Sequence, residues 1–325
     1  MPSVIAIDAK GRVDRTRTLQ DIPGLIGQPD RLLWVDFEHP PTADQLARLG
    51  ELFDLPARTL LHLVKQHRGP RAVRFLKCRL VVIFDVGLDP HDGVQTSELV
   101  HLIGENYLIT THPPQSNVIP LAAQAIEVEI ATFGYTVSTL TYSILDQLVG
   151  RYDTVIGQIQ GEVDQLRQRI LQHHESEGVD DIYRLNQQLG ELRQVMSPEE
   201  ALIGSMHSPQ SASETPDLTD AFQDVSIDLQ TTIGSIDQMA NLVSGLLDTY
   251  ESLKSDALNL LVKRLTVLSI MLALVALIPA LFGISINDPS WPFRTGYVGY
   301  ALNVLGMALL GWLVWIVARR IGWIK

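Results

Sequence analysis

The sequence has 325 residues, 46% of them hydrophobic, with a formal net charge of -12 and a single cysteine, Cys78. The acidic balance argues against nucleic acid as a main partner, and one cysteine excludes intrachain disulfides and multi-cysteine zinc sites. Charge is unevenly spread, because six of the 25 basic residues but only one of the 37 acidic residues lie from Lys263 onward. The acidic part before Lys263 either keeps a domain soluble or favours surroundings rich in cations.

The first part of the chain, residues 1–119, predicts a mixed α/β domain. Four segments are rich in β-branched or apolar residues and end at turn residues, which is typical of strands in one sheet. They are residues 34–37, 80–86, 99–103 and 107–111. Leucines recur at helical spacing in residues 42–52 and 58–64. Thr42 is the expected N-cap of the first of these helices, opposite Gln45 three residues later. We therefore expect helices packed on a sheet.

Residues 120–207 predict a cytosolic helical hairpin. Apolar residues recur at helical spacing from Pro120 to about His174, and again from Asp181 to Met196. The polar run at residues 173–178 contains a glycine and marks the turn between the two helices.

A polar, proline-bounded linker at residues 208–216 separates this hairpin from the rest of the chain. No proline occurs from Asp217 until Pro279, which predicts one helix of about 65 residues. Its first part, residues 217–263, is expected to form a stalk outside the membrane.

Two apolar stretches, residues 264–287 and 297–318, are each long enough to cross a hydrocarbon core of about 30 Å as a helix. The loop between them, residues 288–296, is too short to be a domain, and a basic tail at residues 319–325 ends the chain. Basic residues flank both spans on the side away from this loop, so the positive-inside rule places both termini in the cytoplasm. We expect a multi-pass protein surrounded by the lipids of a bacterial inner (cell) membrane, with a periplasmic loop.

Small and weakly polar residues recur at steps of three or four where the stalk enters the first span, so they share one helix face. This stripe consists of Asn259, Val262, Thr266, Ser269, Ala273, Ala276, Ala280 and Gly283. One interpretation is a close helix-to-helix contact. The other is a pore wall, formed when several copies turn this face toward a symmetry axis and polar rings contact a hydrated ion. Val262 and Leu265 would then form an apolar throat at the cytosolic entrance.

This layout resembles the CorA family of divalent-cation channels and transporters. The family's entrance motif is matched by Asn259, Lys263, Leu265 and Thr266, and from there the signature glycine falls without a gap on Gly283. Further similarity to family motifs lies in residues 34–36, 66–70 and 108–112. The resemblance implies a funnel-shaped homo-pentamer, in which each subunit has an α+β cytosolic domain, a long helical stalk and two transmembrane helices.

The signature at the outer mouth departs from the family pattern. Gly283-Ile284-Ser285 stands where the family has Gly-Met-Asn, or Gly-Ile-Asn in the zinc-type branch, and the nearest asparagine is Asn287. The resemblance implies that these residues, with Asp288, hold the hydrated ion. A serine ring is wider than an asparagine ring unless Asn287 substitutes for it. The Pro-Phe-rich loop and the tryptophans of the second span are similar to the zinc-type branch, which includes ZntB and CmaX.

Three further residues are candidate cation ligands. Asp248 lies three helical turns before Asn259 and could face the stalk axis, or it could be an ordinary exposed charge. His173 and His174 stand beside acidic residues at the hairpin turn, although such a run is usually a solvated turn. The sequence contains no nucleotide-binding loop with the expected lysine, no nucleophile elbow and no metalloprotease helix, so we do not expect an enzyme.

The sequence therefore predicts transport of a divalent cation, Zn²⁺ and/or Mg²⁺, Co²⁺ or Ni²⁺, through the axial pore of a homo-pentamer. The cation is the substrate, no cofactor is expected, and nucleic acid is not expected as a partner. The alternative is a membrane-anchored sensor or scaffold of the same fold that no longer conducts, which the missing signature asparagine favours. A disused pore would tolerate bulky side chains at Ala273, Ala276 and Ala280, and their absence favours transport.

Overall fold

The computed structural model describes residues 2–26, 28, 30–89, 93–173, 178–206, 215–285 and 296–320. Contacts divide the chain into two compact units, Met1–Leu246 and Leu247–Lys325. We call them the N-terminal unit and the C-terminal unit and describe each by itself.

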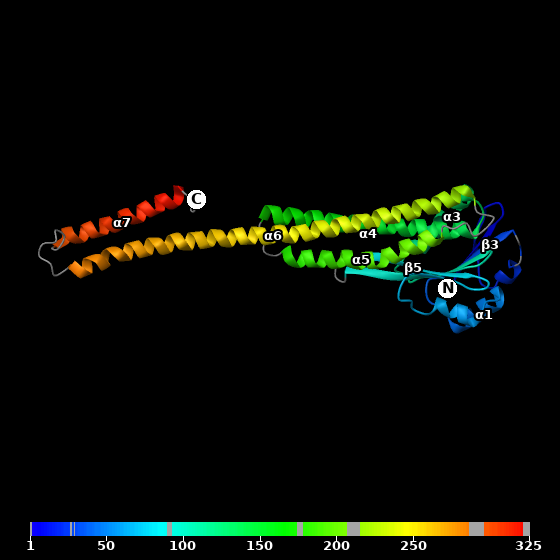
Figure 1. Ribbon diagram of the computed structural model, residues 1–325. Coiled ribbons are helices and arrows are strands. Elements are labelled where there is room, and N and C mark those ends of the chain that lie inside the picture. The colour runs from blue at the N-terminus through cyan, green and yellow to red at the C-terminus, as the bar shows by residue number, and fades with distance from the viewer. Residues whose placement is uncertain are drawn as a thin grey trace. The chain divides into compact units, whose positions relative to one another are not determined.

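The N-terminal unit is built on a seven-stranded sheet with the strand order β2-β1-β3-β7-β6-β5-β4 (Figure 1). The strands are β1 (Ser3–Asp8), β2 (Val13–Arg17), β3 (Arg31–Phe37), β4 (Arg71–Arg74), β5 (Arg79–Asp89), β6 (Gly93–Ile103) and β7 (Tyr107–Thr111). Neighbouring strands pair antiparallel, except that β3 and β7 are parallel at the centre of the sheet. The four predicted strands, β3, β5, β6 and β7, are confirmed, whereas β1, β2 and β4 were not predicted.

One face of the sheet is covered by α1 (Ala43–Phe53), α2 (Ala57–Leu60) and the short 3-10 helix η2 (Leu61–Leu63). Apolar side chains of these helices join alternate residues of the strands in one buried core. The predicted N-cap is confirmed, because the Thr42 hydroxyl accepts from the Gln45 amide and the Gln45 side chain accepts from the Thr42 amide at 2.8 Å. This capping box fixes where α1 begins.

The other face of the sheet packs against longer helices, α3 (Val118–Phe133), α4 (Val137–His173) and α5 (Gly178–Met206). Residues 120–174 were predicted to continue as helix, but the structure breaks between α3 and α4 at Gly134. Its φ of 92° lies in a region that residues with a side chain rarely adopt. Helix α5 also extends through Pro198, well beyond the predicted end at Met196.

The long uninterrupted helix predicted after the linker is confirmed as α6 (Pro216–Ser285), which has 70 residues. Within the N-terminal unit its buried side chains alternate in steps of three and four, the spacing of a coiled-coil seam. They include Leu218, Phe222, Val225, Leu229, Thr232, Ile236, Met239, Val243 and Leu246. Polar contacts flank this seam, with Thr232 donating to Asp153 of α4 at 2.6 Å and Arg193 of α5 paired with Asp237 at 2.8 Å.

The C-terminal unit contains the end of α6 and α7 (Gly296–Arg320), which runs in the opposite direction to α6 (Figure 1). Helix α6 includes an 18-residue stretch with a mean hydropathy of 1.8, sufficient to cross a membrane. Helix α7 carries no charged residue before Arg319. Val267 in α6 and Ala318 in α7 are buried, whereas large side chains such as Leu265, Leu272 and Leu305 are exposed.

Candidate functional site

The stripe predicted on the first span lies on an unbroken stretch of α6. Because the helix has no kink-forming residue between Asn259 and Ala276, side chains three and four positions apart stay on one face. All six described members of the stripe are exposed: Asn259, Val262, Thr266, Ser269, Ala273 and Ala276. This chain alone therefore leaves the described part of the stripe, from Asn259 to Ala276, uncovered.

A different face of the same helix is covered within the chain. Val267 is only 3% exposed, and Met271 and Leu274, one and two turns further along, are half-buried. At 3.6 residues per turn, the centre of this face lies about 140° around the helix from the centre of the stripe. The contacts inside one subunit therefore use a face that points away from the stripe.

The hydroxyl groups of the stripe are internally bonded. Thr266 Oγ1 donates to the Val262 carbonyl at 2.8 Å, and Ser269 Oγ donates to the Leu265 carbonyl at 2.8 Å. These bonds use the hydroxyl protons and leave the oxygen lone pairs as acceptors toward the open side. Such oxygens can accept hydrogen bonds from water molecules around a cation, but they do not supply the charged ligands that a dehydrated divalent ion requires.

The structure describes the remaining predicted residues only in part. Ala280, Gly283, Ile284 and Ser285 belong to the helical backbone of α6, and the surroundings of their side chains are not described. Asn287 and Asp288, predicted at the outer mouth, lie outside the described residues.

The structure describes the predicted cation ligands outside the membrane stretch only in part. Asp248 is exposed on α6, three turns before Asn259 and in the same arc of the helix surface. His173 ends α4, and its side chain and all of His174 lie outside the description. Among the described side chains, no group of three or more His, Cys, Asp and Glu residues is arranged to hold a metal ion.

A buried polar network in the sheet was not predicted. Trp34 Nε1 donates to Thr110 Oγ1 at 3.0 Å, and Thr110 Oγ1 donates to Asp36 Oδ1 at 2.6 Å. The other Asp36 oxygen faces His112 Nε2 at 3.3 Å, while His112 Nδ1 faces the Pro113 carbonyl at 2.9 Å. Since both partners of this imidazole only accept hydrogen bonds, the ring can donate to both of them only when it is doubly protonated. Burial alone would lower the pKa of His112, but hydrogen bonding and the charge of Asp36 outweigh burial and raise it.

The pKa of a nearby histidine in β6, His101, is shifted in the opposite direction. His101 is fully buried, and neither ring nitrogen has a hydrogen-bond partner among the described residues. Burial, with the positive charge of His112 nearby, lowers the pKa of His101 to about 3. This ring is therefore neutral at pH 7, whereas the pKa of the nearby His112 is shifted toward the charged form.

A second buried network joins the sheet to α4 and α5. The Phe84 amide donates to Glu199 Oε1, while Tyr152 Oη lies within hydrogen-bond distance of both Glu199 Oε2 and the Phe84 carbonyl. Tyr152 has a single hydroxyl proton for these two acceptors, so the ring of bonds closes only if Glu199 carries a proton. Burial, with Asp85 nearby, raises the pKa of Glu199 to about 8, although its hydrogen bonds act in the opposite sense.

A sequence signal for this second network does exist. Glu199 occupies an apolar position in the three-and-four spacing of α5, between Met196 and Ile203. A carboxylate in such a position needs buried partners, yet the sequence does not identify Tyr152 or β5 as those partners.

Comparisons with known proteins cover nearly the whole chain. A family model described as CorA-like Mg²⁺ transporter protein matches residues 29–320. The cobalt/magnesium transport protein CorA of Thermotoga maritima is 23% identical over 290 residues, which cover 88% of this chain and 82% of that protein.

Solved structures share the fold. The complete CorA magnesium transporter from Methanocaldococcus jannaschii has a TM-score of 0.80 at 19% identity, covering 99% of this chain and 98% of that one. Full-length CmaX has a TM-score of 0.76 at 17% identity, covering 98% and 97%. The ZntB cytoplasmic domain from Vibrio parahaemolyticus has a TM-score of 0.61 at 13% identity, covering 78% and 98%. The predicted fold of the single chain, with its relation to ZntB and CmaX, is thus confirmed, whereas the predicted pentamer stays a prediction.

Proposed function

Because the chain belongs to the CorA-like Mg²⁺ transporter family, we propose that it conducts hydrated divalent cations through a pore lined by the stripe of α6. The observation that carries this proposal is the exposure of every described stripe residue, together with the covered face on a different side of the helix. A face that packed within the subunit would be buried. An exposed face of a membrane protein contacts lipid, another subunit or water. The hydroxyl groups of Thr266 and Ser269 and the amide of Asn259 favour contact with water.

The pore requires several copies of the chain. Two membrane helices cannot enclose an ion path alone, so symmetry must supply the remaining walls. By family membership we propose a homo-pentamer with five copies of α6 around the axis. In this arrangement Asn259, Thr266 and Ser269 form polar rings, and Val262 with Leu265 forms an apolar throat that closes by losing water. Asp248 adds a ring of negative charge in the same arc of α6.

The ion passes with its water shell. No formal charge and no His or Cys occurs from Leu265 to Asn287, so the path offers no ligand set to replace the water of a divalent ion. We propose Ser285 and Asn287, after Gly283 and Ile284, as the outer ring and Asp288 as its source of negative field. Zn²⁺, Mg²⁺, Co²⁺ and Ni²⁺ are the cations to compare.

We place the protein in the inner membrane of a bacterium with both termini in the cytoplasm. Lys263 and Arg264 precede the first span, and Arg319, Arg320 and Lys325 follow the second, which is the distribution of the positive-inside rule. The cation is the substrate, and we assign no cofactor and no enzymatic activity.

The second candidate is a non-conducting sensor or scaffold. It is favoured by one observation, namely Ser285 in the position of the signature asparagine. The two candidates differ in one measurable property, because only the first has saturable cation flux.

Flux into liposomes separates the candidates. Purified protein is reconstituted with a metal-sensitive dye inside the vesicles, and Zn²⁺, Mg²⁺, Co²⁺ and Ni²⁺ are added outside in turn. Transport predicts saturable uptake of at least one ion, and Ser285→Asn should change the preference among them. No uptake above protein-free vesicles, in the parent and in Ser285→Asn alike, would establish the scaffold.

A further inference from the structure

A strongly basic segment interrupts this acidic protein. From Leu55 to Phe84 the sequence has no Asp or Glu, yet it contains seven of the chain's 25 Lys and Arg residues: Arg58, Lys65, Arg68, Arg71, Arg74, Lys77 and Arg79. The segment belongs to the N-terminal unit, outside the stretch proposed to conduct cations. Such a concentration of positive charge attracts anions.

Two of these arginines face each other across the β4–β5 hairpin. Arg74 and Arg79 are directly opposite in the antiparallel register, so their side chains leave the sheet on the same face. Like charges in this position repel each other. Arg79 is also half-buried, which reduces the water available to screen its charge. Burial, and the charge of Arg74, lower the pKa of Arg79.

Within the part of the chain that the structure describes, neither guanidinium group forms an ion pair or hydrogen bond with a carboxylate. The neighbouring Lys77, in contrast, pairs with Asp54. Glu105 is the one carboxylate that lines the same pocket, but it is exposed and no described contact joins it to either arginine. Among the described residues, the two opposed guanidinium groups of this pocket therefore have no counter-charge.

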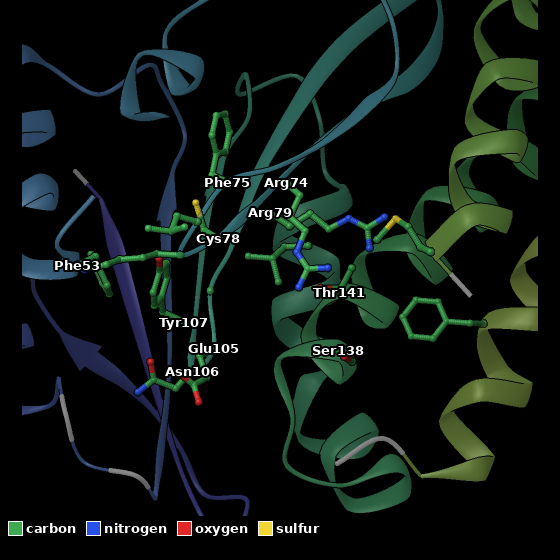
Figure 2. A pocket seen from close by; sticks show the side chains of 16 residues that line it. Phe53, Arg74, Phe75, Cys78, Arg79, Glu105, Asn106, Tyr107, Ser138 and Thr141 are labelled. Atoms are coloured by element: carbon green, nitrogen blue, oxygen red, sulfur yellow. The ribbon is translucent and has the colours of Figure 1, made fainter. Parts of the chain in front are cut away.

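The pocket is large enough for a small-molecule ligand. Its volume is about 710 Å³, within the usual range for ligand sites. Figure 2 shows the Arg74 and Arg79 side chains pointing toward the part of α4 that carries Ser138 and Thr141. The hairpin thus supplies the charge, and α4 supplies hydroxyl groups on the opposite wall.

Aromatic side chains complete the lining. Phe53, Phe75 and Tyr107 come from the sheet side, and Phe222 comes from α6. Tyr107 is 7% exposed, and its hydroxyl has no hydrogen-bond partner among the described residues. A buried hydroxyl without a partner costs free energy, so an additional polar group in the pocket would be favourable.

We propose that this pocket binds a nucleoside phosphate. A pair of guanidinium groups matches phosphate oxygens, to which arginine can donate two parallel hydrogen bonds. Among the aromatic residues of the lining, Phe75 is partly exposed and offers a ring on which a base can stack, whereas Phe53, Tyr107 and Phe222 are buried. The site is separate from the cation path, and the inference stands whether or not the protein conducts.

The test is equilibrium binding to the full-length protein in detergent, with EDTA present so that no metal bridges the phosphate. The probes are ATP, AMP, inorganic phosphate and adenosine, each measured by calorimetry. We expect saturable binding of ATP or AMP, and weaker binding of both inorganic phosphate and adenosine, because each of these lacks half of the recognised chemistry.

Variants locate the site. Arg79→Ala should weaken nucleotide binding about tenfold or more, and Arg79→Lys should weaken it less, because lysine keeps the charge and loses the paired hydrogen bonds. Arg71→Ala is the matched control, since Arg71 is an exposed arginine of the paired strand β4 that does not line the pocket. Arg71→Ala should leave nucleotide binding unchanged. None of the three variants should change the melting temperature.

Four outcomes would overturn the proposal. If none of the four probes binds, nucleoside phosphates are excluded as ligands. If Arg71→Ala and Arg79→Ala weaken nucleotide binding equally, binding is a general attraction between the basic segment and anions. Inorganic phosphate binding as tightly as ATP excludes recognition of the base. A change of oligomer mass in both Arg79 variants, without any nucleotide binding by the parent, assigns the arginine pair to a contact between subunits.

Discussion

The N-terminal and C-terminal units differ in how far they bury their apolar side chains. In the N-terminal unit, both faces of the sheet are covered, and large residues such as Trp34, Leu33 and Tyr152 are almost fully buried. In the C-terminal unit, Leu265 and Leu268 remain more than half exposed on α6. The first unit has a core of its own, whereas large apolar side chains of the second are left exposed by this chain.

The comparison also concerns polar groups. The N-terminal unit buries charged and polar side chains, such as Glu199 and His112, in hydrogen-bonded networks. The stripe of the C-terminal unit carries polar groups on an open face instead. Burial in the first unit fixes structure, and the open face in the second is the one that we propose to line the cation path.

The same substitution should therefore have unequal effects in the two units. Leu33→Ala removes a side chain that is 1% exposed in the sheet core and should lower the free energy of unfolding by about 2–5 kcal/mol. Leu268→Ala, on the exposed side of α6, should change it by less than about 0.5 kcal/mol. Hydrogen exchange measured by mass spectrometry on peptides from β3 and α6 reports each unit separately. Equal losses would show that Leu268 is buried against another subunit.

The buried Glu199 should make the N-terminal unit sensitive to pH. Its pKa rises from an ordinary value of 4.5 to about 8 on folding, so between these values the folded chain holds more protons than the unfolded chain. Stability from this group is thus lost as pH rises from about 4.5 to about 8, by at most about 1.4 kcal/mol per pH unit.

Glu199→Gln tests this pH dependence. An amide can accept from the Phe84 amide and donate to Tyr152, as the protonated acid does, but it does not titrate. The variant should lose the fall in stability between pH 5 and pH 8, measured by urea unfolding at about half-unit intervals of pH. Glu200→Gln, at the adjacent position, is the control and should keep the parental slope. A parental slope in Glu199→Gln would mean that the carboxylate is ionised in the folded protein.

A smaller loss of stability is expected at the start of α1, where a hydrogen bond of the cap rather than burial of a side chain is removed. Thr42→Ala removes the acceptor at the start of α1 and should cost about 1 kcal/mol of unfolding free energy. Thr42→Ser keeps the oxygen and should recover most of that loss. Urea titration of the three proteins checks the series, and a serine variant as unstable as the alanine variant would assign the effect to the lost methyl group instead.

Patterns along the chain were sufficient for β3, β5, β6 and β7, the cap of α1 and the long helix α6, whereas the apolar strand β1 was missed. Edge strands were harder, because β2 and β4 consist largely of polar and charged residues that face water at the sheet margins. The break at Gly134 was missed because the apolar spacing continues across it, and only the backbone conformation reveals the turn. Pairings distant in sequence, such as Glu199 with Tyr152, arise from tertiary packing and leave no local pattern.

The candidate pore face was predicted from residue spacing, since a helix converts spacing directly into a shared face. Spacing could not say whether that face packs within the subunit. The burial of Val267, on a different face from the stripe, supplies that information. The outer residues Asn287 and Asp288 lie outside the described part of the chain, and their role remains a proposal.

Accessibility of two adjacent positions tests most directly whether the stripe faces water. With Cys78 replaced by serine, Ser269→Cys and Leu268→Cys introduce single thiols at nearly the same depth, about 100° apart around the helix. A charged, water-soluble thiol reagent is applied to liposomes during cation uptake. A water-filled pore predicts that the reagent blocks flux through Ser269→Cys and leaves flux through Leu268→Cys unchanged. Equal sensitivity of both variants, or block confined to Leu268→Cys, would contradict a pore lined by this face.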